Sequence, residues 1–174
     1  MENAEKIFTK LEQEGFSYIQ QMIIKQQEEN IFLTFQRKTD CTNSVLSKDD
    51  KKNYEKNISF FSHVSGGVII WGVASSKNKN GVHIAGKIQP ISNGKAFLSN
   101  LNYLFLKNFT AINPDANNIY IPFPEEKSKG FVITYVSGNN YLLRLNNYYI
   151  KNRDNFVMML GQILLNDVLK NRRL

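Results

Sequence analysis

The chain has 174 residues, the usual length of one domain, and its 42% of apolar residues is enough to build a core, which excludes a wholly disordered chain. One Cys excludes an internal disulfide, and with only two His it also excludes the ordinary zinc ligand sets. The 22 Lys and Arg outnumber the 15 Asp and Glu, a net charge of +7, which favours an anionic partner, with nucleic acid ahead of an acidic membrane surface.

The charge is unevenly distributed along the chain. Residues 1–30 hold three Lys and six Glu, a net charge of −3, whereas residues 31–174 hold 19 basic and nine acidic residues, a net charge of +10. A basic face on the later part of the chain is one interpretation, and ordinary solvated surface charge is the other. The sequence has no run of about 18 apolar residues and no apolar signal core, so we expect a cytoplasmic protein with no membrane partner.

The first half of the chain predicts two helical regions and two strands. Helical spacing of apolar residues extends from Ala4 to Ile23 and is broken at Gly15, and residues 31–35 read as a strand before a polar loop at 39–47. Ser47 and Asp50 resemble a capping box, which begins a helix that stops at the Gly66-Gly67 turn. Residues 68–73 lack alternation, as a strand buried on both faces would.

The second half predicts further strands and two helices. We expect a turn at 75–81, strands at 82–84, 117–122, 131–136, 141–145 and 148–151, and helices at 96–105 and 156–169. Hairpin signals stand at 138–140 and at Asn146-Asn147. The order of these elements predicts an α+β fold with flanking helices, and its β-sheet is expected to be mixed because the strands after residue 130 lie too close for crossover helices.

We compared the sequence with the residue patterns that a phosphate-binding loop, a nucleophilic site and a metal-dependent nuclease site require. Gly67 and Gly72 have the spacing of a phosphate loop, but the Lys and Ser or Thr that should follow are absent, so Gly66, Gly67 and Gly72 are interpreted as structural turn residues. Cys41 has no neighbouring His, which leaves nucleophilic catalysis with little support. Carboxylates at Glu28, Glu29 and Asp40 could hold Mg²⁺ for a nuclease, although composition favours an exposed acidic helix end.

Basic residues beside aromatic ones give the clearest binding signal. Lys151 and Arg153 follow Tyr148 and Tyr149, and Arg144 stands nearby. Such a strand can present cations to phosphates and rings to bases, and Arg37-Lys38 ends the first strand in a similar way. The alternative, in which the apolar side chains face the core and the cations are merely solvated, stays open.

Several segments taken in order resemble the Schlafen-type AlbA domain, a DNA-binding domain of bacterial Schlafen-like proteins. The segments are FLTFQRK at 32–38, ISFFSHVSGG at 58–67, VIIWGV at 68–73, GFVITYV at 130–136 and YYIK at 148–151. The resemblance covers residues 28–156, most of the chain. Outside it, apolar spacing predicts a helical segment at 1–27 and a C-terminal helix at 157–174, which we expect to pack on the same domain.

Nuclease members of the Schlafen group carry acidic residues that this chain mostly lacks. Glu29 corresponds to the first of them, whereas Thr34 and the Ala74-Ser75 pair stand where others are expected. A lone carboxylate binds Mg²⁺ poorly because water must supply most of its ligands. The resemblance therefore implies a domain with a degenerate nuclease site, no cofactor and no resident metal, and it favours a binding domain over an enzyme.

We therefore expect a nucleic-acid-binding domain with a role in defence or regulation. The predicted contacts are Arg37, Lys38, Arg144, Lys151 and Arg153. One alternative is a metal-dependent endoribonuclease that uses Glu29 and Mg²⁺, and another is a protein-interaction or self-assembly module in a homo-oligomer or larger defence assembly. The sequence leaves the choice between DNA and RNA open.

Overall fold

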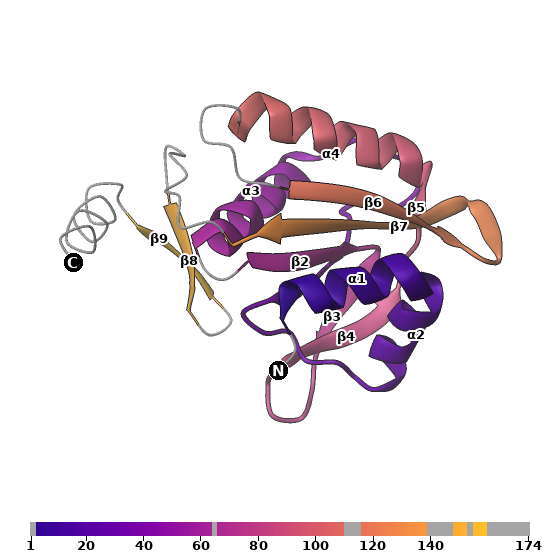
Figure 1. Cartoon of the computed structure of the whole chain (residues 1–174), viewed down its shortest axis with the longest axis horizontal. Helices are drawn as coiled ribbons and strands as arrows, with labels where there is room; N and C mark the ends of the chain where they lie inside the picture. The colour runs from indigo at the N-terminus through magenta and orange to yellow at the C-terminus, as the bar shows by residue number, and fades with distance from the viewer. Residues whose placement is uncertain (1–2, 64–65, 110–115, 139–147, 153–154, 160–174) are drawn as a thin grey trace.

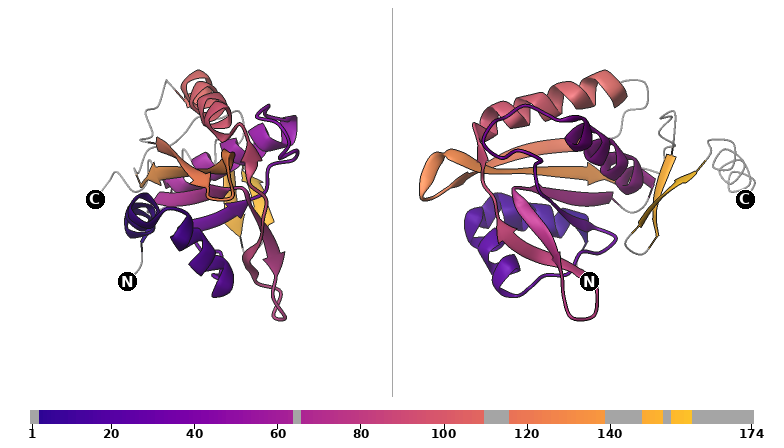
Figure 2. Two further views of the ribbon diagram at one scale, coloured as in Figure 1. Left: turned by 90° about the vertical axis from the view of Figure 1, so that its right-hand side faces the viewer. Right: turned by 180° about the vertical axis from the view of Figure 1, so that it is seen from behind.

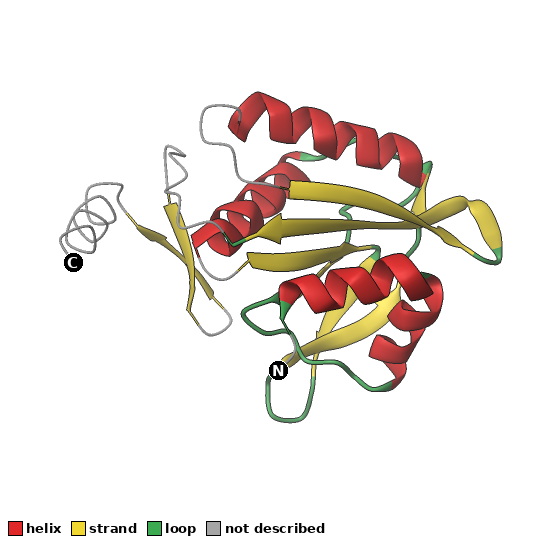
Figure 3. Ribbon diagram, viewed as in Figure 1, coloured by secondary structure: helices red, strands yellow, loops and turns green. Residues whose placement is uncertain are grey.

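The computed structural model describes residues 3–63, 66–109, 116–138, 148–152 and 155–159. Within these ranges the chain forms a five-stranded mixed sheet with helices on both faces (Figures 1 and 3). The α+β fold with a mixed sheet, which the order of the elements predicts, is confirmed. The helices are α1 (Ala4–Glu14), α2 (Phe16–Ile24), α3 (Lys48–His63) and α4 (Gly94–Phe109).

The sheet is built around one long strand. β7 (Glu126–Ser137) pairs in antiparallel fashion with β2 (Gly66–Trp71), β5 (Ile91–Ser92) and β6 (Ala116–Phe123). β1 (Leu33–Gln36) adds to β2 in the parallel direction, with Leu33 opposite Val68 and Gln36 opposite Trp71. Two further hairpins are formed by β3 (Val73–Lys77) with β4 (His83–Ile88) and by β8 (Tyr148–Asn152) with β9 (Asn155–Met159).

Side chains of β2 alternate between two hydrophobic clusters, one on each face of the sheet. Val68 and Ile70 belong to the cluster that includes residues of α1 and α2, whereas Ile69 and Trp71 belong to the cluster that includes residues of α3 and α4. Figure 2 shows the two pairs of helices on opposite faces of the sheet. Every residue of β2 is buried, which confirms the strand predicted from the absence of alternation. None of the described helices is both long and apolar enough to cross a membrane.

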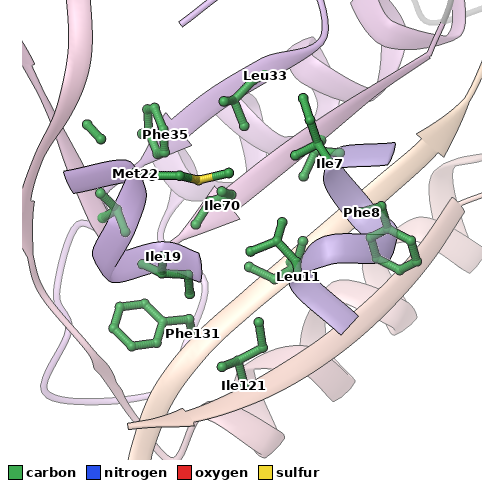
Figure 4. Close-up of a cluster of buried hydrophobic side chains, with 14 of the residues drawn as sticks. Ile7, Phe8, Leu11, Ile19, Met22, Leu33, Phe35, Ile70, Ile121 and Phe131 are labelled. Carbon is green, nitrogen blue, oxygen red and sulfur yellow. The ribbon is translucent and has the colours of Figure 1, made fainter. Parts of the chain in front are cut away.

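The two N-terminal helices belong to the same core as the sheet. Figure 4 shows Ile7 and Leu11 of α1 and Ile19 of α2 grouped with Ile70 and Phe131 of the sheet. Gly15 separates the two helices at φ +58, where the sequence predicts a break. Residues 4–24 are therefore packed on the sheet as part of one hydrophobic cluster.

Several boundaries differ from those predicted. Gly72 has φ +97 and ends β2, so Val73 begins the next strand. The predicted turn at 75–81 begins later than expected, because 75–77 belong to β3. The reversal lies at Asn78, whose side chain accepts hydrogen bonds from the amides of Asn80 and Val82 at 2.9 and 3.0 Å. The predicted helix at 156–169 is wrong at its start, because 156–159 lie in β9, and its remainder lies outside the described residues.

The two glycines that begin β2 are required for different structural reasons. Gly66 has φ +84, as predicted for the turn into the strand. Gly67 is not in a left-handed conformation, and its constraint is packing, because a Cβ there would lie 1.9 Å from Cδ1 of Phe61. The absence of a side chain at Gly67 therefore allows α3 to pack closely against β2.

Candidate functional site

A network of hydrogen bonds joins the chain after β1 to the start of α3. The amide and hydroxyl of Thr39 donate to Oδ1 of Asp50 at 2.9 and 2.8 Å, and the amide of Ser47 donates to Oδ2 at 3.0 Å. The Asp50 amide in turn donates to the Ser47 hydroxyl at 3.0 Å, which confirms the predicted capping box. This network holds residues 37–39 beside the first turns of α3.

Lys38 lies inside the protein, with only 2% of its surface exposed. Its ammonium group donates to the carbonyl oxygen of Asp40 at 2.6 Å and lies 4.0 Å from Oδ2 of Asp50. The same ammonium lies 5.7 Å from the centre of the Phe97 ring. This burial argues against the predicted phosphate contact of Lys38 and gives it a structural role, since it ties the loop after β1 to α3 and α4.

Asp50 is ionised under conditions in which most buried carboxyls would not be. Burial raises its pKa, but hydrogen bonds from the backbone amides of Thr39 and Ser47 and from their hydroxyls outweigh burial, so the pKa is held below the usual 3.8. The carboxylate therefore favours the folded state at pH values above the pKa of the unfolded chain.

The stabilising effect of the ionised Asp50 carboxylate is expected to make the free energy of unfolding depend on pH. A depressed folded-state pKa gives stability that is present at neutral pH and is lost as the pH falls through the folded pKa. Asp50→Asn is therefore expected to unfold at lower urea than the natural chain at pH 7, with the gap narrowing below about pH 4. Urea unfolding at pH 7, 5 and 3 measures the gap, and a gap independent of pH would contradict this role of the charge.

An open hollow of about 380 Å³ lies between the end of β1 and the first half of α3. We refer to it as the basic hollow. Its first wall comes from Gln36, Arg37 and Thr39, and its second from Asp49, Lys52, Asn53 and Lys56. Three cationic side chains therefore surround the space together with one carboxylate and two amides. The network around Asp50 and Lys38 holds the two walls together.

The cations of the basic hollow differ in their surroundings. Arg37 and Lys52 are exposed and form no ion pair within the described residues. Lys56 is half-buried, and burial together with the charge of Lys52 lowers the pKa of its ammonium group. Two lysines one helical turn apart repel each other, so an anion between them would be attracted by both.

The acidic residues considered for a nuclease make separate contacts. Oε1 of Glu29 accepts hydrogen bonds from the Thr34 hydroxyl at 3.0 Å and the Phe35 amide at 2.8 Å, so Glu29 lies beside Thr34, where the Schlafen resemblance predicts an acid. Asp40 binds its own loop through Thr42 at 2.7 Å, and Glu28 receives a bond from Asn78 at 3.4 Å. Among the described residues no three His, Cys, Asp or Glu are grouped to hold a metal ion.

Some of the other predicted nucleic-acid contacts lie within the described residues, and others lie outside them. Arg37 lines the basic hollow, whereas Arg144 and Arg153 lie outside the described residues. Lys151 is a backbone member of β8, opposite Phe156, and its side chain is not described. His83 is bonded through Nδ1 to the Ser75 hydroxyl at 2.9 Å, in the hairpin of β3 and β4.

The sequence reasoning missed Lys52, Asn53 and Lys56. A signal for them was present, because Lys48, Lys52 and Lys56 recur every four residues and therefore share one face of the predicted helix. Their meeting with Arg37 could not be predicted, because it depends on how the loop at 39–47 returns α3 to the end of β1.

Comparison of the chain with protein-family models gives no match, and comparison with curated protein sequences gives none either. The resemblance to the Schlafen-type AlbA domain therefore stays a prediction.

Proposed function

We propose that the protein binds nucleic acid and that the basic hollow contacts its phosphates. The observation that carries this proposal is the placement of Arg37, Lys52 and Lys56 around one open space with a single carboxylate, Asp49. Phosphate contacts by Lys and Arg supply most of the affinity of nucleic-acid-binding proteins. Asn53 and Gln36 add amide groups that can donate to phosphate or sugar oxygens.

Composition and the strand contacts of Glu29 support the same interpretation. Residues 31–174 carry a net charge of +10, which attracts a polyanion over the whole surface. Oε1 of the Glu29 carboxylate accepts hydrogen bonds from the Thr34 hydroxyl and the Phe35 amide, which gives Glu29 a structural role beside β1. A nucleic-acid-binding domain with a degenerate nuclease site therefore fits these contacts better than the endoribonuclease alternative.

Binding to a labelled oligonucleotide is expected to weaken steeply as salt rises. A protein that contacts about four phosphates loses orders of magnitude in affinity over a moderate rise in salt concentration, because bound counterions are released from the nucleic acid. Lys52→Ala is expected to lower affinity for all sequences alike and to reduce the slope of log affinity against log salt by about one. Fluorescence anisotropy across a salt series measures both quantities.

Lys51→Ala is the matched control for this experiment. Lys51 is exposed on α3 next to Lys52 but does not line the basic hollow, so its removal changes the net charge equally. Equal losses in the two variants would overturn the role of the basic hollow, and salt-insensitive binding would overturn the whole proposal. Binding is expected to survive EDTA, whereas RNA cleavage that needs Mg²⁺ and disappears in Glu29→Gln would establish the endoribonuclease instead.

A further inference from the structure

The outer side of α4 carries two large apolar side chains that the fold leaves exposed. Tyr103 keeps 69% of its surface exposed, and Leu106 keeps 60%. The two residues are three apart on a helix, so they are neighbours on one face. Figures 1 and 2 show α4 on the outside of the molecule, with the sheet on its other side. Exposed apolar side chains that belong to a continuous face mark an interaction surface.

Two small exposed residues extend this face toward the start of α4. Ala96, Ser99, Tyr103 and Leu106 follow one another at intervals of three, four and three residues, which is the spacing of a coiled-coil seam. We refer to these four residues as the α4 seam. With 3.6 residues per turn, they form a line on the side of the helix that faces away from its buried residues Phe97, Leu101 and Leu104.

Polar groups on and beside the α4 seam already have partners within the protein. The Ser99 hydroxyl donates to the carbonyl oxygen of Lys95 at 3.1 Å, so it is turned back onto its own helix. Beside the seam, Oδ1 of Asn102 accepts a hydrogen bond from the side chain of Asn118 at 2.7 Å. Covering the seam with apolar atoms therefore leaves the Ser99 hydroxyl bonded and buries no charge.

A second copy of α4 has the shape that this seam fits. When two α4 helices lie antiparallel, the small residues near the start of one copy come opposite the large residues near the end of the other. Ala96 then lies opposite Leu106, and Ser99 lies opposite Tyr103. Small side chains opposite large ones interdigitate, and twofold symmetry repeats each contact in the other half of the interface.

The charges on α4 also permit pairing with a second copy. The helix carries Lys95 and Lys107 and has no Asp or Glu. The two lysines stand on opposite flanks of the α4 seam and near opposite ends of the helix, so a symmetric antiparallel pair brings neither of them across from a lysine of the other copy. The seam between them is uncharged, so two copies meet there without the cost of like charges at an interface.

We propose that the protein forms a weak symmetric dimer in which the α4 seams of two copies pack antiparallel. A helix of 16 residues is about 24 Å long. A contact one helix wide buries less than the roughly 800 Å² per partner of a standard interface, which makes the dimer a weak one. We expect a dissociation constant of about 10 to 100 μM. This inference does not depend on nucleic-acid binding.

Sedimentation velocity over a concentration series measures the dissociation constant. Leu106→Asp is expected to raise it about tenfold or more, because the new carboxylate would be buried in the α4 seam. Ile24→Asp is the matched control, since Ile24 is 74% exposed at the end of α2 and its replacement adds the same charge away from α4. Ile24→Asp is expected to dimerise like the natural chain.

Salt separates this dimer from nucleic-acid binding. Each copy carries a net charge of +7, so added salt screens the repulsion between copies and leaves apolar contacts in place. The dimer is therefore expected to persist or strengthen in the salt range over which oligonucleotide binding weakens.

Cysteine pairs test the register in a Cys41→Ser background, which removes the single natural thiol. A short bifunctional thiol reagent is expected to join Ser99→Cys of one copy to Tyr103→Cys of a differently tagged copy. The yield is expected to be several-fold higher than for Ala96→Cys with Ser99→Cys, which the antiparallel register separates by about 10 Å along the helix axis.

Four outcomes would overturn the proposal. The first is a monomer at concentrations about ten times the expected dissociation constant. Equal dissociation constants for Leu106→Asp and Ile24→Asp would place the dimer contact away from α4. Better crosslinking of the Ala96 and Ser99 variants would exclude the antiparallel register. Binding to anionic lipid vesicles by a chain that stays monomeric, lost in Leu106→Asp, would assign the α4 seam to a lipid surface instead.

Discussion

Gly67→Ala is expected to destabilise the protein by about 3 kcal/mol, the upper part of the usual range for overpacking a core. The new Cβ would lie 1.9 Å from Cδ1 and 2.1 Å from Cγ of Phe61, whose ring is fully buried between α3 and the sheet. The ring has no open space to enter, so α3 or β2 must shift. Urea unfolding followed by circular dichroism measures the loss.

Gly81→Ala is the matched control, because it adds the same methyl group without a clash. Gly81 has φ +78 and a Cβ there would meet nothing within 4 Å, so only backbone strain of about 1 to 2 kcal/mol is expected. Combining Gly67→Ala with Phe61→Leu is expected to cost less than the sum of the two single changes, because the second removes the obstructing ring. If Gly67→Ala were no worse than Gly81→Ala, packing against Phe61 would not be the reason for the glycine.

Features that depend on near neighbours were predictable from the sequence. The start of α3 follows from Ser47 and Asp50, which are three residues apart and bond each other's amides. The break at Gly15 and the burial of β2 follow equally from local composition. The mixed sheet was predictable because closely spaced strands leave no room for helical crossovers.

Features that depend on distant neighbours were not predictable. Arg37 and Lys38 are adjacent cations that the sequence does not distinguish. Arg37 lines the basic hollow, whereas Lys38 is buried against Asp50 and Phe97. Side chains on neighbouring residues of an extended chain point in opposite directions, so a division of roles was foreseeable. Which of the two would be buried depends on the loop at 39–47, whose path is set by bonds to β5 and α4.

Those bonds show how the loop is fixed. The amide of Ser92 in β5 donates to the carbonyl of Cys41 at 2.9 Å, and the side chain of Asn100 in α4 donates to the carbonyl of Ser44 at 2.9 Å. No local sequence pattern predicts either of these two contacts. The lengths of β3 and β4 were underestimated for a different reason, since the Lys- and Asn-rich stretch between them favoured a longer turn than the one formed.

Lys38→Met is expected to destabilise the protein by about 3 kcal/mol, because removing one member of a buried ion pair leaves the other without compensation. Methionine preserves the unbranched shape and can still contact the Phe97 ring, but it cannot donate to the Asp40 carbonyl, now bonded at 2.6 Å, or balance the Asp50 charge at 4.0 Å. Thermal and urea unfolding at pH 7 measure the effect.

Arg37→Met gives the opposite pattern and is therefore the decisive control. It removes the same charge one residue earlier, from an exposed side chain, so its stability is expected to stay within about 0.5 kcal/mol of the natural chain. Oligonucleotide affinity, by contrast, is expected to fall in Arg37→Met because a phosphate contact is lost. Lys38→Met, measured where it is still folded, is expected to retain more of the affinity than Arg37→Met. If both variants kept their stability and lost affinity equally, Lys38 would belong to the binding surface and its burial in the loop network would not describe its role.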